Sequence, residues 1–115
     1  RSGGALYIDK NCSAVWTAAS DLIANNAGRS GGALNVGDRS NVKWTASSNF
    51  SVNSARENGG ALHLWGHSSA HWTAVSLFFG NSAGLFGGAA RLRNGCSGIW
   101  GAVSTFSNNN ATLGG

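Results

Sequence analysis

Hydrophobic and polar positions alternate in short stretches along this chain, and the same alternation returns every 28 residues. In the first stretch Leu6 and Ile8 enclose the variable residue Tyr7, and Leu34 and Val36 enclose a variable residue in the same way. A period of two is typical of a β-strand with one buried face, whereas an amphipathic helix needs a period near 3.6. The pattern therefore predicts short β-strands rather than helices.

The repeat contains three such stretches, and several of its positions hardly vary. Each unit has Gly-Gly-Ala at its third to fifth positions, followed by a tryptophan, then a leucine or phenylalanine, then an asparagine. The three columns are Trp16, Trp44, Trp72 and Trp100; Leu22, Phe50, Phe78 and Phe106; and Asn25, Asn53, Asn81 and Asn109. The units span 1–28, 29–56, 57–84 and 85–112 without insertion or deletion, and residues 113–115 begin a fifth. Constant unit length indicates coils stacked in register, which is the mark of a solenoid.

Three strands separated by Gly, Ser, Asn and Asp turns describe one coil of a parallel β-helix. We therefore expect residues 1–115 to form an all-β, single β-helical segment of a longer protein, with about four coils and three strands per 28-residue coil. Equivalent residues should stack at about 4.8 Å, the spacing of neighbouring strands. The aromatic columns should form buried stacks, and the asparagine column should hold a bend through hydrogen bonds to the turn backbone and from coil to coil.

The composition excludes several classes of protein. Charged residues make up 10% of the chain, against about 25% in an average domain, and hydrophobic residues make up 42%, which excludes charge-expanded disorder. No apolar run approaches 18 residues, so no transmembrane helix is expected. The net charge of +4 is spread along the chain instead of being gathered in a patch, so we expect no nucleic-acid partner.

Two motifs resemble the repeats of the polymorphic outer membrane proteins, which combine GGA plus Ile, Leu or Val with F-x-x-N. They are Gly3-Gly4-Ala5-Leu6, Gly31-Gly32-Ala33-Leu34 and Gly59-Gly60-Ala61-Leu62, with Gly87-Gly88-Ala89-Ala90 weaker, and Phe50-Ser51-Val52-Asn53, Phe78-Phe79-Gly80-Asn81 and Phe106-Ser107-Asn108-Asn109. The resemblance implies a right-handed β-helix that is extracellular or displayed at the cell surface. It also implies an adhesive or structural role, with surface glycans or host and cell-surface proteins as partners.

Acidic and histidine side chains supply little catalytic chemistry. The acids are Asp9, Asp21, Asp38 and Glu57. Because they form no evident acid/base pair, we expect no enzyme activity in this segment and no catalytic residues. His63, His67 and His71 lie in the third unit, with His63 and His71 expected to face outward and His67 to lie in a turn. They should lie on different walls, so no metal site and no cofactor is expected.

Trp65 is the one tryptophan outside the column, and its equivalents are Asp9, Gly37 and Arg93. The position is therefore turn-like and expected to be exposed. Trp65 is either a packed turn aromatic or, together with His63 or His67, a weak candidate for stacking on a sugar or a neighbouring chain.

Cys12 and Cys96 share one repeat position but lie three coils apart, about 14 Å at the spacing of neighbouring strands. Because a disulfide needs Cα atoms within about 7 Å, the two should not bridge each other.

The expected function is that of a structural or adhesive segment in an extracellular scaffold or filament. Bare β edges are templates for pairing, so further coils, a cap or another subunit should cover the open ends. The alternative is a carbohydrate-binding or polysaccharide-processing β-helix whose active residues lie elsewhere or around Trp65. Thr17, Thr45 and Thr73 suggest ice binding less strongly, because Lys43 and His71 interrupt the flat surface it needs.

Overall fold

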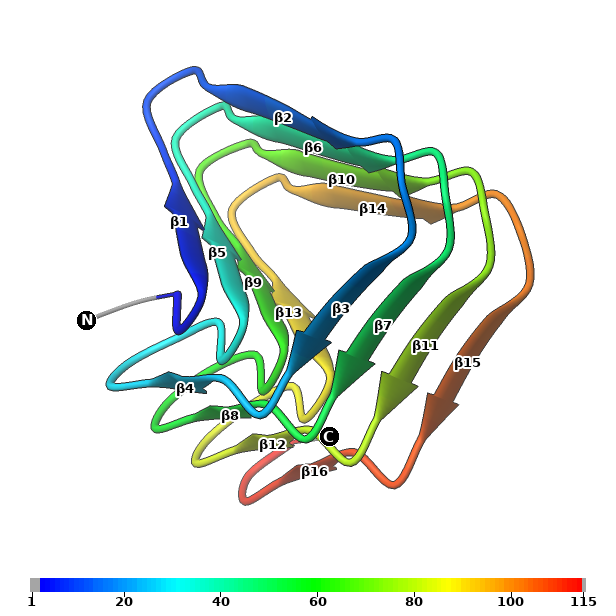
Figure 1. Ribbon diagram of the computed structural model, residues 1–115. Helices are drawn as coiled ribbons and strands as arrows, with labels where there is room; N and C mark the ends of the chain where they lie inside the picture. The colour runs from blue at the N-terminus through cyan, green and yellow to red at the C-terminus, as the bar shows by residue number, and fades with distance from the viewer. Residues whose placement is uncertain (1–2, 115) are drawn as a thin grey trace.

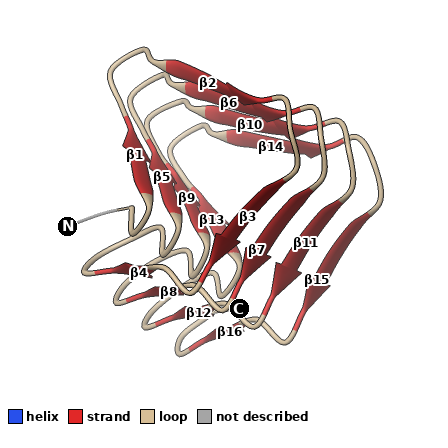
Figure 2. Cartoon of the chain, in the orientation of Figure 1, coloured by secondary structure: helices blue, strands red, loops and turns tan. Residues whose placement is uncertain are grey.

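The computed structural model describes residues 3–114; Arg1 and Ser2 of the first unit and Gly115 of the fifth lie outside this part. Within it the chain forms sixteen strands, and these build four parallel sheets that take one strand from every coil (Figures 1 and 2). The predicted parallel β-solenoid of about four coils is confirmed. No helix that could cross a membrane is found among residues 3–114.

Each sheet collects equivalent strands of successive coils, and every paired residue lies 28 positions from its partner, as in Leu6 with Leu34 and Trp44 with Trp72. The first sheet holds β1 (Leu6–Ile8), β5 (Leu34–Val36), β9 (Leu62–Leu64) and β13 (Ala90–Leu92). The second holds β2 (Ser13–Trp16), β6 (Asn41–Trp44), β10 (Ser69–Trp72) and β14 (Ser97–Trp100). The third holds β3 (Ser20–Ile23), β7 (Ser48–Ser51), β11 (Ser76–Phe79) and β15 (Ser104–Ser107). The fourth holds β4 (Asn26–Ala27), β8 (Ser54–Ala55), β12 (Ser82–Ala83) and β16 (Asn110–Ala111).

The expectation of three strands per coil is wrong, because each coil has four. The third predicted stretch is cut in two by a residue in the left-handed conformation. This residue is Ala24, Val52, Gly80 or Asn108, with φ between 54° and 63°. Left-handed φ bends the chain at this point, so the residues after it form a separate two-residue strand in the fourth sheet. Alternation alone could not show this break, because alanine and valine rarely adopt that conformation.

The two glycines that open each unit have different roles. The first, exemplified by Gly31 with φ of 67°, adopts the left-handed conformation. The second is needed for space, because a Cβ on Gly32 would overlap the carbonyl oxygen of Gly60 in the next coil. Gly-Gly therefore joins a residue with positive φ to one whose position leaves no room for a Cβ.

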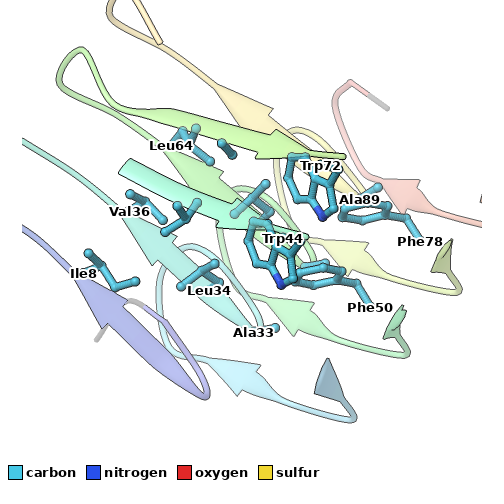
Figure 3. Packing of buried hydrophobic residues seen from close by; sticks show 14 residues of the cluster. Ile8, Ala33, Leu34, Val36, Trp44, Phe50, Leu64, Trp72, Phe78 and Ala89 are labelled. Atoms are coloured by element: carbon cyan, nitrogen blue, oxygen red, sulfur yellow. The ribbon is translucent and has the colours of Figure 1, made fainter. Parts of the chain in front are cut away.

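The core consists of side-chain columns that run along the axis (Figure 3). The indole rings of Trp16, Trp44, Trp72 and Trp100 stack with centroids 4.6, 4.5 and 4.8 Å apart. Phe50 stacks on Phe78 at 4.7 Å, and Phe78 on Phe106 at 4.6 Å. Trp44, Trp72, Phe50 and Phe78 are fully buried. Trp44, Trp72 and Phe78 therefore each stack on the equivalent ring of both neighbouring coils, whereas Phe50 has Leu22 on one side. The two aromatic columns also meet edge to face.

The asparagine column forms a directional polar ladder beside this core. The backbone N–H and the Nδ2 of Asn25 both donate to Oδ1 of Asn53, at 2.9 and 3.0 Å. Asn53 donates in the same way to Asn81, and Asn81 to Asn109. The Nδ2 of Asn53 also donates to the Leu22 carbonyl at 2.7 Å. These bonds satisfy buried amides at the bend that follows the left-handed residue.

We predict that Trp72→Ala lowers the free energy of unfolding by about 3–5 kcal/mol, because it removes a buried ring that is stacked on both faces. Urea unfolding of the two proteins measures the difference. Val75→Ala is the control, since Val75 is 56% exposed and its loss should change stability by no more than about 0.5 kcal/mol. A loss below about 1 kcal/mol for Trp72→Ala would show that the column does not carry the core.

We predict that Val52→Gly raises the stability. Val52 has φ of 55° and is 57% exposed, so the substitution relieves left-handed strain while removing little packing. Strain of about 1–2 kcal/mol, less the entropic cost of glycine, leaves a net gain of about 0.5–1 kcal/mol. Thermal unfolding should show a higher Tm for Val52→Gly and a lower Tm for Val103→Gly, where no positive φ exists. A lower Tm for both variants would contradict this account of the bend.

Candidate functional site

A groove lies on the outer face of the first sheet, where the chain between the fourth and first sheets projects away from the axis and turns back (Figure 1). We call these connections the arms; their tips are Arg29–Ser30, Glu57–Asn58 and Leu85–Phe86, held together by parallel bridges from Ser30 to Asn58 and from Asn58 to Phe86. The groove has a volume of about 330 Å³. Its lining residues are Tyr7, Arg29, Ser30, Asn35, Glu57, Asn58, His63, Trp65, Arg93 and Asn94.

The arms cover side chains that alternation alone places in solvent. Asn35 and His63 lie on the outer face of the first sheet as expected, yet only 2% and 6% of their surface is exposed. The Nδ2 of Asn35 donates to the Ser30 carbonyl at 3.4 Å, which ties the sheet to the arm. The expected exposure of His63 is therefore wrong, because the returning chain forms a second layer over this face.

Trp65 is half-buried and packed against the preceding coil, whereas its position in the repeat was expected to be exposed. Its indole lies across Gly37 of the preceding coil, where any Cβ would overlap the ring. Its Nε1 donates to Oδ1 of Asn35 at 2.9 Å. Position 9 of the repeat thus accommodates an indole because the coil below has glycine at that position.

The Trp65 hydrogen bond sets the orientation of the Asn35 amide and, through it, the tautomer of His63. Because Oδ1 of Asn35 accepts from Trp65, its Nδ2 is oriented toward Nδ1 of His63, 3.1 Å away. An amide N–H can only donate, so Nδ1 of neutral His63 accepts and the proton resides on Nε2. That Nε2 is buried and has no hydrogen-bond partner among residues 3–114. Of the buried polar atoms without a partner in that range, it alone belongs to a residue that lines the groove.

Arginines surround this imidazole. Burial, and then the positive charges of Arg93 and Arg91, lower the pKa of His63 from 6.5 to about 4. Arg91 is fixed by a 2.7 Å hydrogen bond to Oδ1 of Asn58 and lies 4.2 Å from the centre of the Phe86 ring. Arg93 is exposed and has no carboxylate partner within the described part of the chain. The positive field at His63 therefore comes from two guanidinium groups, one packed and one open to solvent.

The two remaining charged side chains of the lining lie on the arms. Arg29 and Glu57 form a 3.5 Å ion pair there, so their charges largely cancel.

The end of the groove near the first coil has the opposite character. The Tyr7 hydroxyl donates to Asp9 at 3.2 Å. Desolvation, followed by the negative charges of Asp9 and Asp38, raises the pKa of Tyr7. The groove therefore has a positive end at the fourth coil, while the carboxylates of Asp9 and Asp38 lie near Tyr7 at its other end without lining it.

The other candidate histidines lie outside the groove. His67 is exposed in a turn with φ of 61° and lies over Gly95, and His71 is on the outer face of β10. Residues 3–114 contain no group of three His, Cys, Asp or Glu side chains placed to hold a metal ion. The groove thus unites two of the three weak candidates, His63 and Trp65, and leaves His67 apart.

The threonine row and the cysteines are occupied in backbone contacts. Thr45 Oγ1 donates to the Trp16 carbonyl at 3.2 Å, and Thr73 Oγ1 to the Trp44 carbonyl at 3.1 Å. Both hydroxyls therefore donate within the solenoid, to the backbone of the preceding coil. Cys12 and Cys96 are not bridged, in agreement with their separation by three coils.

Sequence reasoning missed the arms, and with them Asn35, Asn58 and Arg91 as parts of the site. The available signal was the three positions between the alanine of the fourth strand and Gly-Gly. They carry Arg29 and Glu57, and a coil of three strands leaves them without a role. Comparison with family models, curated protein sequences and solved structures gave no match.

We predict that His63 makes the protein less stable in acid. Its pKa is about 4 when folded and near 6.5 when unfolded, so the unfolded chain binds the extra proton first as the pH falls. Stability should drop between pH 6.5 and 4 by up to about 3 kcal/mol from this group. The measurement is urea unfolding across this range for wild type and His63→Asn, which has no titrating ring. An identical pH dependence in both proteins would contradict the prediction.

Proposed function

We propose that this chain is a structural segment of an extracellular scaffold, in which coils of the same 28-residue pattern continue the solenoid beyond both ends. The observation that supports this is the contrast between middle and terminal coils. Trp44 and Phe50 are fully buried, whereas Trp16 and Trp100 are only partly buried and Phe106 is 47% exposed. A terminal ring has a neighbouring coil on one side only, and another coil would cover its other face.

The polar ladders also support continuation in a single direction. Every asparagine donates from one coil to the oxygen of the next, so Asn25 retains an Oδ1 acceptor at one end and Asn109 retains donors at the other. Head-to-tail stacking pairs these groups, whereas head-to-head stacking would place like groups together. The unpaired backbone N–H and C=O groups at the edges of the terminal strands would likewise be paired by head-to-tail stacking.

We also propose that the protein is displayed at a cell surface and that its solenoid winds in a right-handed sense. The resemblance of the GGAL and F-x-x-N motifs to polymorphic outer membrane protein repeats supports display at a cell surface, with an adhesive role for the variable outward positions. Right-handed winding is proposed because parallel crossovers in one sheet are right-handed in about 98% of cases.

Self-association of the chain tests the proposal. We predict that sedimentation velocity shows concentration-dependent association of the wild type, which Phe106→Lys weakens at least about tenfold by placing a charge on the exposed end of a column. Val103→Lys is the matched control, because Val103 is the more exposed residue but lies on the side of the solenoid. A chain ending at Thr112 should associate more tightly, because Leu113 and Gly114 occupy positions that the next coil needs.

The two cysteines report the geometry of the complex. In a head-to-tail stack Cys96 and Cys12 of the next copy occupy one column, about 4.8 Å apart and within disulfide range. Mild oxidation with copper phenanthroline should therefore cross-link the wild type but not Cys12→Ser. A monomer at all concentrations, or equal weakening by both lysine variants, would contradict axial stacking.

A further inference from the structure

The groove on the outer face of the first sheet has an excess of hydrogen-bond donors at its positive end. The order of hydrogen bonds from Trp65 through Asn35 to His63 leaves the Nε2 proton of His63 without an acceptor. A buried donor without a partner is destabilising, and because His63 lines the groove, an acceptor bound there would satisfy this one. The exposed guanidinium of Arg93 provides further donors and a positive charge at the same end of the groove.

This donor set selects the charge of the ligand. Arg29 is paired with Glu57, which leaves Arg91 and Arg93 as the guanidinium groups that act on His63. At neutral pH the imidazole carries no charge and presents one N–H. A carboxylate matches this arrangement because it accepts two bonds from a guanidinium and a further bond from a neutral N–H.

The remainder of the groove selects the shape of the ligand. The indole of Trp65 is half-buried, and it shares the lining of the groove with the hydroxyl of Ser30 and the amide of Asn58 on the arms. A volume of about 330 Å³ lies at the lower end of the range for ligand pockets, about 300–1,000 Å³. An aromatic side chain among polar groups suits a ring that has apolar faces and hydroxylated edges. The groove also crosses all four coils, so it can follow a linear chain of such rings.

We propose that the groove binds an acidic saccharide, with a sugar carboxylate held by Arg93 and the Nε2 proton of His63, and a sugar ring against Trp65. This function does not depend on axial stacking. It also gives a function to His63, Trp65 and Arg93, which stand at the variable positions 7 and 9 of the repeat.

The direct test is calorimetric titration of the protein with trigalacturonic acid at pH 7 and low salt. We expect binding to the wild type, at least about tenfold weaker binding to Arg93→Gln, and weaker binding to Trp65→Phe. Arg93 is exposed, so its substitution leaves the fold intact. Lys43→Gln is the matched control, because it removes one exposed positive charge from β6, outside the groove, and should leave the affinity unchanged.

Two further ligands separate the sources of affinity. The methyl ester of trigalacturonic acid retains the rings without the charge, and acetate retains the charge without the rings. We expect both to bind at least about tenfold more weakly than the acid. In addition, NMR titration should show that the bound acid raises the pKa of His63. Equal affinity for the ester, equal affinity for acetate, equal loss in Lys43→Gln, or no binding at all would each overturn the proposal.

Discussion

The backbone ladder between coils is the constraint on which the rest of this structure depends. Parallel pairing with a shift of 28 residues places each side chain directly over its equivalent in the next coil. A buried side chain therefore packs best when the same residue type recurs every 28 positions. Aromatic rings meet this demand by stacking at 4.5 to 4.8 Å, close to the strand spacing itself. Asparagine meets it by donating upward and accepting from below. Uniform columns are therefore the consequence of the ladder, and they leave the outward positions free to vary.

The groove shows what that freedom allows. Positions 7 and 9 differ in every coil, yet Asn35, His63 and Trp65 form one hydrogen-bonded chain across two of them. The arms that cover these hydrogen-bonded side chains are also held in register by parallel bridges. Side chains that differ between coils are therefore placed on a backbone that repeats regularly. Trp65 depends on Gly37 below it, which means that the site is specified by a combination of coils and belongs to no single repeat.

Periodicity predicted the parallel solenoid, its register and its side-chain columns, because stacked coils must place equivalent residues over one another. The spacing of Trp44 and Trp72 alone sets the register, and the distance between Cys12 and Cys96 follows from it. The fourth strand was not predictable in this way, since Ala24 and Val52 give no sign of left-handed φ. The groove was predictable only in part. Trp65 and His63 stood out as exceptions to the repeat, but the burial of His63 depends on arms whose path no alternation encodes.

The register of the ladder can be measured directly by NMR couplings across hydrogen bonds. The account predicts that the Thr45 amide couples to the Trp16 carbonyl and the Thr73 amide to the Trp44 carbonyl, each bond joining neighbouring coils at 3.0 and 2.9 Å. Couplings that link these amides to carbonyls nearby in the sequence, or to a coil shifted from this register, would contradict the solenoid and everything derived from it.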